Sequence, residues 1–313
     1  IRGLRNSVAK RPSSQVIDDL REALLYGEWG EQALIEALQA LDPEALNTFV
    51  AQFWRGAKAE ALLYGNYQPG LVQEVSTLLA DVVSEDTPPA LPEVKVLQLA
   101  AGDSLLYDVE VPHDDAVVAW YLQGRGDSWE DRAATLLTGQ IMKSGFFQQL
   151  RTEQQLGYVV SAFAWPQRDV PGLVMLVQSP VADAPAILES MDTFMRGVSG
   201  DLDEDQFARH RAALLSEIRR PDKNMWERAE FYWQSIAKKR WEFDGREALA
   251  SAVEALSLSD WNAYFKAVFL DQRHSLQVIS PGKRQKLPEG EDLQRFKDAT
   301  AIKAGHAAYV IER

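Results

Sequence analysis

The residues best placed to do chemistry together in this sequence are an arginine and a tyrosine a few positions apart, Arg151 and Tyr158. A guanidinium can hold a peptide carbonyl, and a phenolic O–H can donate to an oxygen that gains negative charge. Gly157 suits the position just after a helix, so we expect Arg151 near a helix end and Tyr158 at the start of the next strand. Taken alone, an arginine and a tyrosine this close in sequence are more often structural.

No other group of side chains has the spacing of a known catalytic or metal site. No two of the four histidines have the spacing that places both on one helix face for a metal. These histidines are His113, His210, His274 and His306. Cysteine is absent, which excludes disulfides, a thiol nucleophile and iron–sulfur clusters. Neither a Gly-x-Ser-x-Gly motif nor a glycine-rich phosphate loop is present. The sequence therefore predicts no metal bound by this chain.

Acidic residues dominate the charge, and the net charge is −13. This charge repels phosphate backbones and anionic lipid heads, so neither nucleic acid nor a membrane is expected as a partner. The longest apolar stretches, such as 116–122, fall short of the roughly 20 residues that span a bilayer. Acidic pairs such as Asp114–Asp115 fall at loop ends or helix starts, where we expect solvated carboxylates.

The first part of the chain has mainly helical periodicity. Residues 14–53 predict three helices, and the third begins at Asp42–Pro43, an N-cap acid followed by a proline at the first helical position. Residues 60–66 predict a short buried strand, and residues 70–83 predict a further helix. The polar, proline-rich stretch from Ser84 to Pro92 is expected to be a linker.

Beyond residue 92 the periodicity changes to that of strands. Strands are predicted at 94–99, 105–111, 116–122, 158–165, 172–178 and 274–279. A long amphipathic helix at 129–155 carries Arg151, and further helices fill 185–269. Short turns between neighbouring strands predict a mostly antiparallel sheet with helices packed on one face, an α+β fold.

The stretch 11–66 resembles the stretch 220–280 in its order of parts. Both begin with Arg-Pro, run through helices to a capped helix start, and end in a predicted strand. This indicates two related domains in tandem. Residue 1 is Ile and no apolar leader follows it, so we expect the first domain to be truncated. The expected domains are 1–92 with the linker, 93–281 as a complete domain, and 282–313 as a C-terminal tail.

The segment 150–158, Leu-Arg-Thr-Glu-Gln-Gln-Leu-Gly-Tyr, resembles the C-terminal signature of the pitrilysin/insulinase family of zinc peptidases. The resemblance extends to segments 59–66, 173–179, 220–223 and 230–233, and it covers nearly the whole chain up to Pro281. In that family four related α+β domains form two halves around a closed chamber. By this resemblance the chain is the back part of the third domain followed by the whole fourth domain, the C-terminal half without the zinc-binding half.

The resemblance also implies roles for individual residues. The family's zinc ligands form an inverted His-x-x-Glu-His motif in the first domain, and this sequence contains no such motif. Zinc is therefore expected in the full-length parent and not in this chain. Arg151 is implied to grip the backbone of a peptide substrate, and Tyr158 to bind substrate and stabilise the tetrahedral intermediate. The partners implied are a peptide and the N-terminal half of the same protein.

Three functions remain open from the sequence. The first is the C-terminal, substrate-contacting half of a zinc endopeptidase that degrades peptides in a closed chamber. The second is a non-catalytic structural or partner-binding subunit of the same superfamily, and the third is a relative dedicated to maturing one cofactor-precursor peptide. The family expectation for the compartment of a bacterial member is the periplasm.

Overall fold

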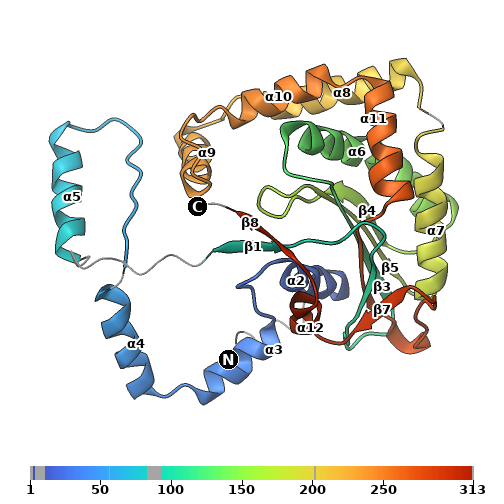
Figure 1. Cartoon of the computed structure of the whole chain (residues 1–313), viewed down its shortest axis with the longest axis horizontal. Coiled ribbons are helices and arrows are strands. Elements are labelled where there is room, and N and C mark those ends of the chain that lie inside the picture. The colour runs from blue at the N-terminus through green and yellow to red at the C-terminus, as the bar shows by residue number, and fades with distance from the viewer. Residues whose placement is uncertain (1–2, 4–10, 56, 83–92, 201, 312–313) are drawn as a thin grey trace.

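The computed structural model describes residues 3, 11–55, 57–82, 93–200 and 202–311. Its centre is a six-stranded sheet with the strand order β4-β5-β3-β6-β2-β7 (Figure 1). The strands are β2 (Ser104–Asp108), β3 (Ala116–Gln123), β4 (Val159–Ala164), β5 (Gly172–Ser179), β6 (Ser275–Ser280) and β7 (Leu293–Phe296). β4, β5, β3 and β6 pair antiparallel, and β2 runs parallel to both β6 and β7. The α+β class and the mostly antiparallel sheet predicted from the sequence are confirmed.

Both faces of the sheet are covered, which explains why the central strand β3 is buried along its whole length and apolar from Ala116 to Leu122. Val118 and Trp120 of β3 face one hydrophobic core, while Val117 and Tyr121 face the other. The first core is built with α6 (Trp129–Phe147), α7 (Ala184–Gly197), α8 (Glu204–Ile218), α10 (Gly245–Ala255) and α11 (Leu258–Phe265). The second core is closed by α2 (Pro12–Leu24) and α12 (Ala299–Ala304). Among the described helices, five thus pack on one face of the sheet and two on the other.

Residues 282–313, set apart in the sequence as a tail, supply three elements to this body. β7 extends the sheet beside β2, and β8 (Ala308–Ile311) pairs antiparallel with β1 (Val94–Leu97) in a separate two-stranded sheet. Between them, Ala299 and Ile302 of α12 are buried in the same core as Leu20 of α2. The start of the described chain and its end therefore pack against each other.

Three helices extend from the body one after another, α3 (Glu31–Ala40), α4 (Pro43–Arg55) and α5 (Gly70–Val82) (Figure 1). α4 begins where the sequence predicts. The Ala45 N–H donates to Asp42 Oδ1 at 2.7 Å, which caps the helix, and Pro43 occupies the first turn. The side chains Leu38, Phe49, Phe53 and Leu78 on these helices are exposed. This part of the chain shows a large apolar surface to solvent.

The strand predicted at residues 60–66 is wrong. The structure has irregular backbone there, and Tyr64 packs edge-on against Tyr232 of α9 (Met225–Ala237), with ring centroids 5.3 Å apart. A strand needs a neighbour to satisfy its backbone groups, and no strand pairs with this segment in the part of the chain that is described. The linker predicted at Ser84–Pro92 lies outside the described residues.

Candidate functional site

Strand pairing brings three polar residues together where the neighbouring strands β3, β4 and β5 begin or end. Gln178 lies near the end of β5. On one side it pairs with Val159, the first residue of β4, and on the other side it pairs with Val117, near the start of β3. Asp115 directly precedes β3, and Tyr158 directly precedes β4. Because β5 runs antiparallel to both neighbours, Asp115, Tyr158 and Gln178 meet at these strand ends.

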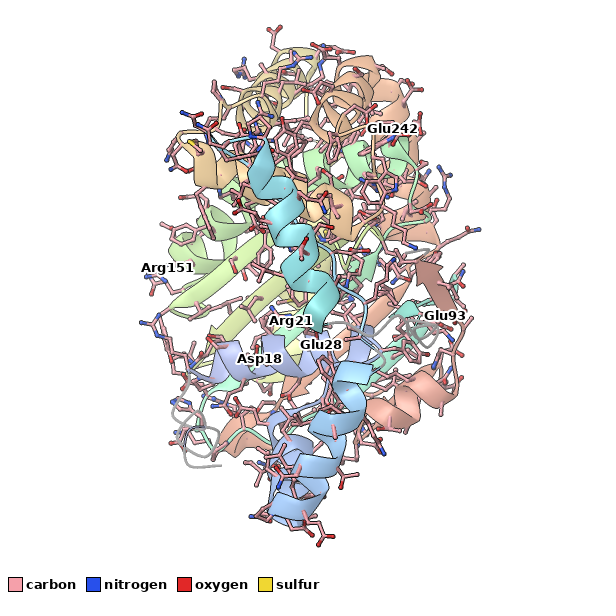
Figure 2. The ribbon with its side chains drawn as sticks, turned by 90° about the vertical axis from the view of Figure 1, so that its left-hand side faces the viewer. Asp18, Arg21, Glu28, Glu93, Arg151 and Glu242 are labelled. Carbon is pink, nitrogen blue, oxygen red and sulfur yellow. The ribbon has the colours of Figure 1, made fainter. Side chains whose placement is uncertain are left out.

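Arg151 reaches the same corner from a wide helical turn. α6 continues into a π-helix, η1 (Gln148–Glu153), a conformation that is rare and frequent at functional sites. Arg151 Nη1 donates to the backbone carbonyl of Tyr158, and its guanidinium stacks over Phe147 at 5.3 Å. Figure 2 shows Arg151 at the margin of the molecule. The arginine and the tyrosine therefore share one helix-to-strand corner, as the sequence predicts.

Gly157 has a different role from the one predicted. The residue with left-handed backbone after the helix is Gln155, with φ of 53°, so the assignment of Gly157 as the residue that terminates the helix is wrong. A Cβ at Gly157 would collide with the backbone carbonyl of Gln178 and press against Ser179. Glycine is required here because the chain entering β4 lies directly against β5.

The phenol of Tyr158 belongs to a hydrogen-bonded cluster. Tyr158 is half-exposed, and its O–H donates to Asp115 Oδ2 at 2.8 Å. Gln178 Nε2 donates to the same carboxylate oxygen at 2.9 Å and also lies against the phenolic oxygen. The Ser13 N–H at the start of α2 donates to Gln178 Oε1 at 3.2 Å and orients the amide.

Asp115 corrects a second prediction, because the acidic pair at 114–115 was expected to be solvated. Asp114 is exposed and meets Lys283 at 3.2 Å, but Asp115 is only 7% exposed. Its backbone N–H donates to His113 Nδ1 at 3.0 Å. Alternation along the strand explains the difference, since the residue that enters β3 turns inward while its neighbour turns outward.

The protonation states of this pair are set by their contacts. Burial by itself raises the pKa of Asp115, but hydrogen bonds from Gln178 and Tyr158 and the nearby His113 and Lys283 outweigh it, so the pKa is lowered. The pKa of Tyr158 is raised, first by burial and then by its hydrogen bond to the Asp115 carboxylate and the charge of that group. At neutral pH the site holds a carboxylate beside a neutral phenol.

This arrangement can bind a polar chain and donate a hydrogen bond to it from the Tyr158 phenol. Arg151 supplies a fixed cation and Tyr158 a neutral O–H donor on the same exposed corner. A polar cavity of about 580 Å³, lined by His113, Asp114 and Lys283 among others, lies on the other side of the residues that precede β3, and neither Arg151 nor Tyr158 lines it. A ligand at the corner would therefore contact Arg151 and Tyr158 at the surface and not inside this cavity.

The residues present do not fit a zinc ion. No group of three His, Cys, Asp or Glu side chains in the described ranges is arranged to hold a metal. His113 is hydrogen-bonded to Asp115, and His306 Nδ1 lies 2.7 Å from the Ile302 carbonyl. Nor does any described helix have the length and apolar character needed to cross a membrane.

Comparisons with known proteins agree on one family. A family model described as PQQ synthase PqqF-like, C-terminal lobe domain 4, matches residues 137–233. The insulin-degrading enzyme of Homo sapiens is 30% identical over 297 residues, which cover 89% of this chain and 28% of that protein. The insulin-degrading enzyme of Drosophila melanogaster is 23% identical over 293 residues, covering 90% of this chain and 29% of that protein.

Solved structures show the same fold. The crystal structure of pitrilysin matches with a TM-score of 0.88 at 18% identity, covering 99% of this chain and 34% of that chain. A structure described as a peptidase M16 inactive domain from Pseudomonas fluorescens matches with a TM-score of 0.61 at 12% identity, covering 92% of this chain and 71% of that chain.

These matches define a peptidase-family domain from a C-terminal lobe. The chain belongs to the pitrilysin/insulinase (M16) family and corresponds to a part of its C-terminal half, which confirms the resemblance seen in the sequence. It spans less than a third of the length of both insulin-degrading enzymes.

Proposed function

We propose that this chain is the substrate-contacting part of a zinc-dependent endopeptidase that degrades peptides in a closed chamber. The observation that carries the proposal is that the Arg151 guanidinium, which donates to the backbone carbonyl of Tyr158, and the neutral Tyr158 phenol lie at one exposed corner of the sheet. The zinc ion and the general base would be supplied by residues outside this sequence, from the N-terminal half of the parent protein. The described residues hold no site for them.

Each residue has a role that its chemistry supports. Arg151 would hold a backbone carbonyl of the bound peptide, because a guanidinium is always charged and carries several donors. Tyr158 would donate its O–H to the oxygen of the tetrahedral intermediate, where the negative charge develops. A phenol has one O–H and in this structure its hydrogen bond goes to Asp115, so the hydroxyl must turn from Asp115 to the substrate.

The experiment replaces both residues in the full-length parent. Tyr158→Phe removes one donor but keeps the ring, so folding should survive while kcat falls on the order of 100- to 1000-fold with little change in KM. Arg151→Ala should raise KM as well, because the cation contacts the peptide before and during the reaction. Steady-state kinetics on a fluorogenic peptide measure both changes.

Thermal melts of both variants are the control. A purely structural role predicts lower stability together with nearly normal kinetics in the molecules that stay folded. If Tyr158→Phe retains more than about half of the parental kcat, which is far above the loss expected for an oxyanion donor, Tyr158 is a packing residue.

A second candidate is a relative dedicated to maturing one cofactor-precursor peptide. The description of the matched family model, a PqqF-like PQQ synthase, favours it. Under this candidate the parent would cleave one defined peptide and leave unrelated peptides of similar length intact. Cleavage of a mixture of unrelated peptides, followed by mass spectrometry, separates it from the leading proposal.

The third candidate is a non-catalytic subunit. The name of one structural neighbour, a peptidase M16 inactive domain, favours it, as does the hydrogen bond that the Tyr158 phenol already donates to Asp115. In that case the parent would cleave no peptide whatever residue stands at position 158.

A further inference from the structure

A second cavity lies at the other end of β4 from Tyr158. It measures about 260 Å³ and lies among the start of α6, the loop that joins β4 to β5, and helices α9 and α10. Ala164, the last residue of β4, lines it, so about 20 Å of strand separates it from the Arg151–Tyr158 corner. We call it the Trp129 cavity. Much of its lining is apolar, from Trp129, Leu136, Ala164, Pro171, Phe231 and Leu249.

The charged side chains around the Trp129 cavity are not balanced. Five cations line it and one carboxylate does, in a chain whose net charge is −13. The cations are Arg132, Arg168, Lys238, Arg240 and Arg246, and the carboxylate is Asp169. Arg246 is matched by Asp222, which stands outside the lining, at 2.7 Å. An excess of positive charge therefore remains at the cavity itself.

Asp169 is shared among three of these cations. Its carboxylate lies 3.0 Å from Arg240, 3.2 Å from Lys238 and 3.7 Å from Arg132. One negative charge cannot neutralise three positive charges, and Asp169 is largely buried, so water screens the cluster only weakly. An additional anion at this point would be attracted.

Two guanidiniums flank one indole at the same place. Arg132 lies 4.7 Å and Arg240 lies 4.8 Å from the centre of the Trp129 ring. Nε of Arg132 is buried and has no hydrogen-bond partner among the described residues. Burial lowers the pKa of Arg132; Asp169 and, more weakly, Asp127 oppose this effect, while the like charge of Arg240 adds to it. The wall of the cavity thus contains donor capacity that the protein leaves unused.

We propose that the Trp129 cavity binds the free carboxylate of a ligand that carries one large apolar group. The apolar group would occupy the floor, since a cavity of about 150 Å³ already holds a benzene ring. The carboxylate would meet Arg132 and Arg240 at the wall, where guanidiniums bind carboxylates with paired hydrogen bonds. A peptide that ends in an aromatic residue supplies this chemistry; that source rests on the proposed function, whereas the binding chemistry does not.

Isothermal titration calorimetry with two matched probes tests the proposal on this chain. N-acetyl-L-phenylalanine carries the ring and the carboxylate, and N-acetyl-L-phenylalanine amide carries the ring alone. We expect the acid to bind at least about tenfold more tightly than the amide at neutral pH and low salt, the factor that one charge-assisted contact supplies. Equal affinities for the two probes, or no heat from the acid at millimolar concentration, overturn the proposal.

Variants locate the binding. Arg240→Gln should weaken binding of the acid about tenfold and leave the amide unchanged. Arg168 is an exposed residue of the β4–β5 loop. Arg168→Gln is the second variant should Arg240→Gln fold poorly, and it should also weaken binding of the acid. Arg219→Gln is the matched control, because Arg219 pairs with Glu254 at 2.6 Å away from the cavity and should change nothing. An equal loss in Arg219→Gln and Arg240→Gln refutes the site. No peptide cleavage is measured, so this result is independent of the test of Tyr158.

Discussion

At the scale of single residues, the buried carboxylate of Asp115 sets the state of Tyr158. The carboxylate accepts from the phenol at 2.8 Å and from Gln178 at 2.9 Å, and these hydrogen bonds keep Asp115 ionised although it is buried. The negative charge in turn raises the pKa of Tyr158 and keeps the phenol protonated. A tyrosine that must donate a proton is thus protected from losing it to solvent.

Asp115→Asn is expected to lower the pKa of Tyr158 toward the ordinary value of about 10, because the charge that opposes ionisation is gone. The difference in tyrosinate absorbance between Asp115→Asn and Asp115→Asn/Tyr158→Phe isolates this phenol. Asp114→Asn is the matched control, since Asp114 is exposed and does not contact the phenol. An unchanged alkaline titration in Asp115→Asn would show that the carboxylate does not control Tyr158.

Asp115 should also contribute to the acid stability of the fold. Its folded pKa is depressed, so its contribution to the free energy of unfolding is fully present above the unfolded value of about 3.9 and is lost as pH falls through the folded value. The free energy of unfolding of Asp115→Asn should therefore fall less steeply than that of the unaltered protein below about pH 4. Urea unfolding at a series of acidic pH values measures the slopes, and parallel curves would contradict the expectation.

At the scale of elements, the last strands and helix of the chain complete the body. β7 pairs with β2, β8 pairs with β1, and α12 closes the core between the sheet and α2. Ile302 of α12 is fully buried, whereas Val310 of β8 is half-exposed. Residues 282–313 therefore contribute to stability through a small number of buried positions.

Ile302→Ala should reduce the free energy of unfolding by about 2–5 kcal/mol, the range for truncating a buried isoleucine. Val310→Ala, in the same C-terminal region but half-exposed, should cost under about 1 kcal/mol. Chemical denaturation measures both. Equal and small effects would mean that α12 does not pack as described.

At the scale of the whole molecule, the body is continuous while α3, α4 and α5 project from it with apolar side chains in solvent. Phe49 is 60% exposed and Leu78 is 65% exposed, which is unusual for residues of this size on helices. The chain spans 28% of the length of the human relative. Under the proposed function this surface would be covered by the part of the parent that precedes this chain, including the front part of the third domain.

The chain alone should therefore bind 8-anilinonaphthalene-1-sulfonate, and its fluorescence should fall when the preceding part of the parent is added. Phe49→Ser/Phe53→Ser should weaken association of the two parts at least about tenfold, because two large apolar side chains leave the interface. The melting temperature of the isolated chain should barely change, since both residues are exposed. Val310→Ser is the control. Full association of the Phe49/Phe53 variant would show that this surface is not the interface.

The chain alone should also neither retain zinc nor cleave peptides, because the described residues offer no cluster of ligands for the metal. Metal analysis after dialysis, together with a peptidase assay, checks both points. About one tightly held zinc ion per chain, with activity lost on chelation, would overturn the proposal that the zinc site lies outside this sequence.

The sequence by itself determined what local patterns encode. The signature around Arg151 and Tyr158 identifies the family, and a helix running straight into a strand brings both residues to one corner without any distant partner. The apolar run at 116–122 indicates a strand, and Asp42 marks a helix start that the structure shows as capped. Each of these signals depends on residues within a few positions of one another.

Only the tertiary structure decided what depends on pairing across the chain. Asp115 and Gln178 join Tyr158 because β5 lies between β3 and β4 in one register, and a shift of one residue would turn them away from each other. Gly157 is needed because β5 passes beside it, which no local pattern reveals. Residues 60–66 have the composition of a strand but no strand beside them, whereas 293–296 and 308–311 are strands because β2 and β1 offer free edges. A strand exists only where another strand can satisfy its backbone hydrogen bonds, and the position of that neighbour is a property of the whole fold.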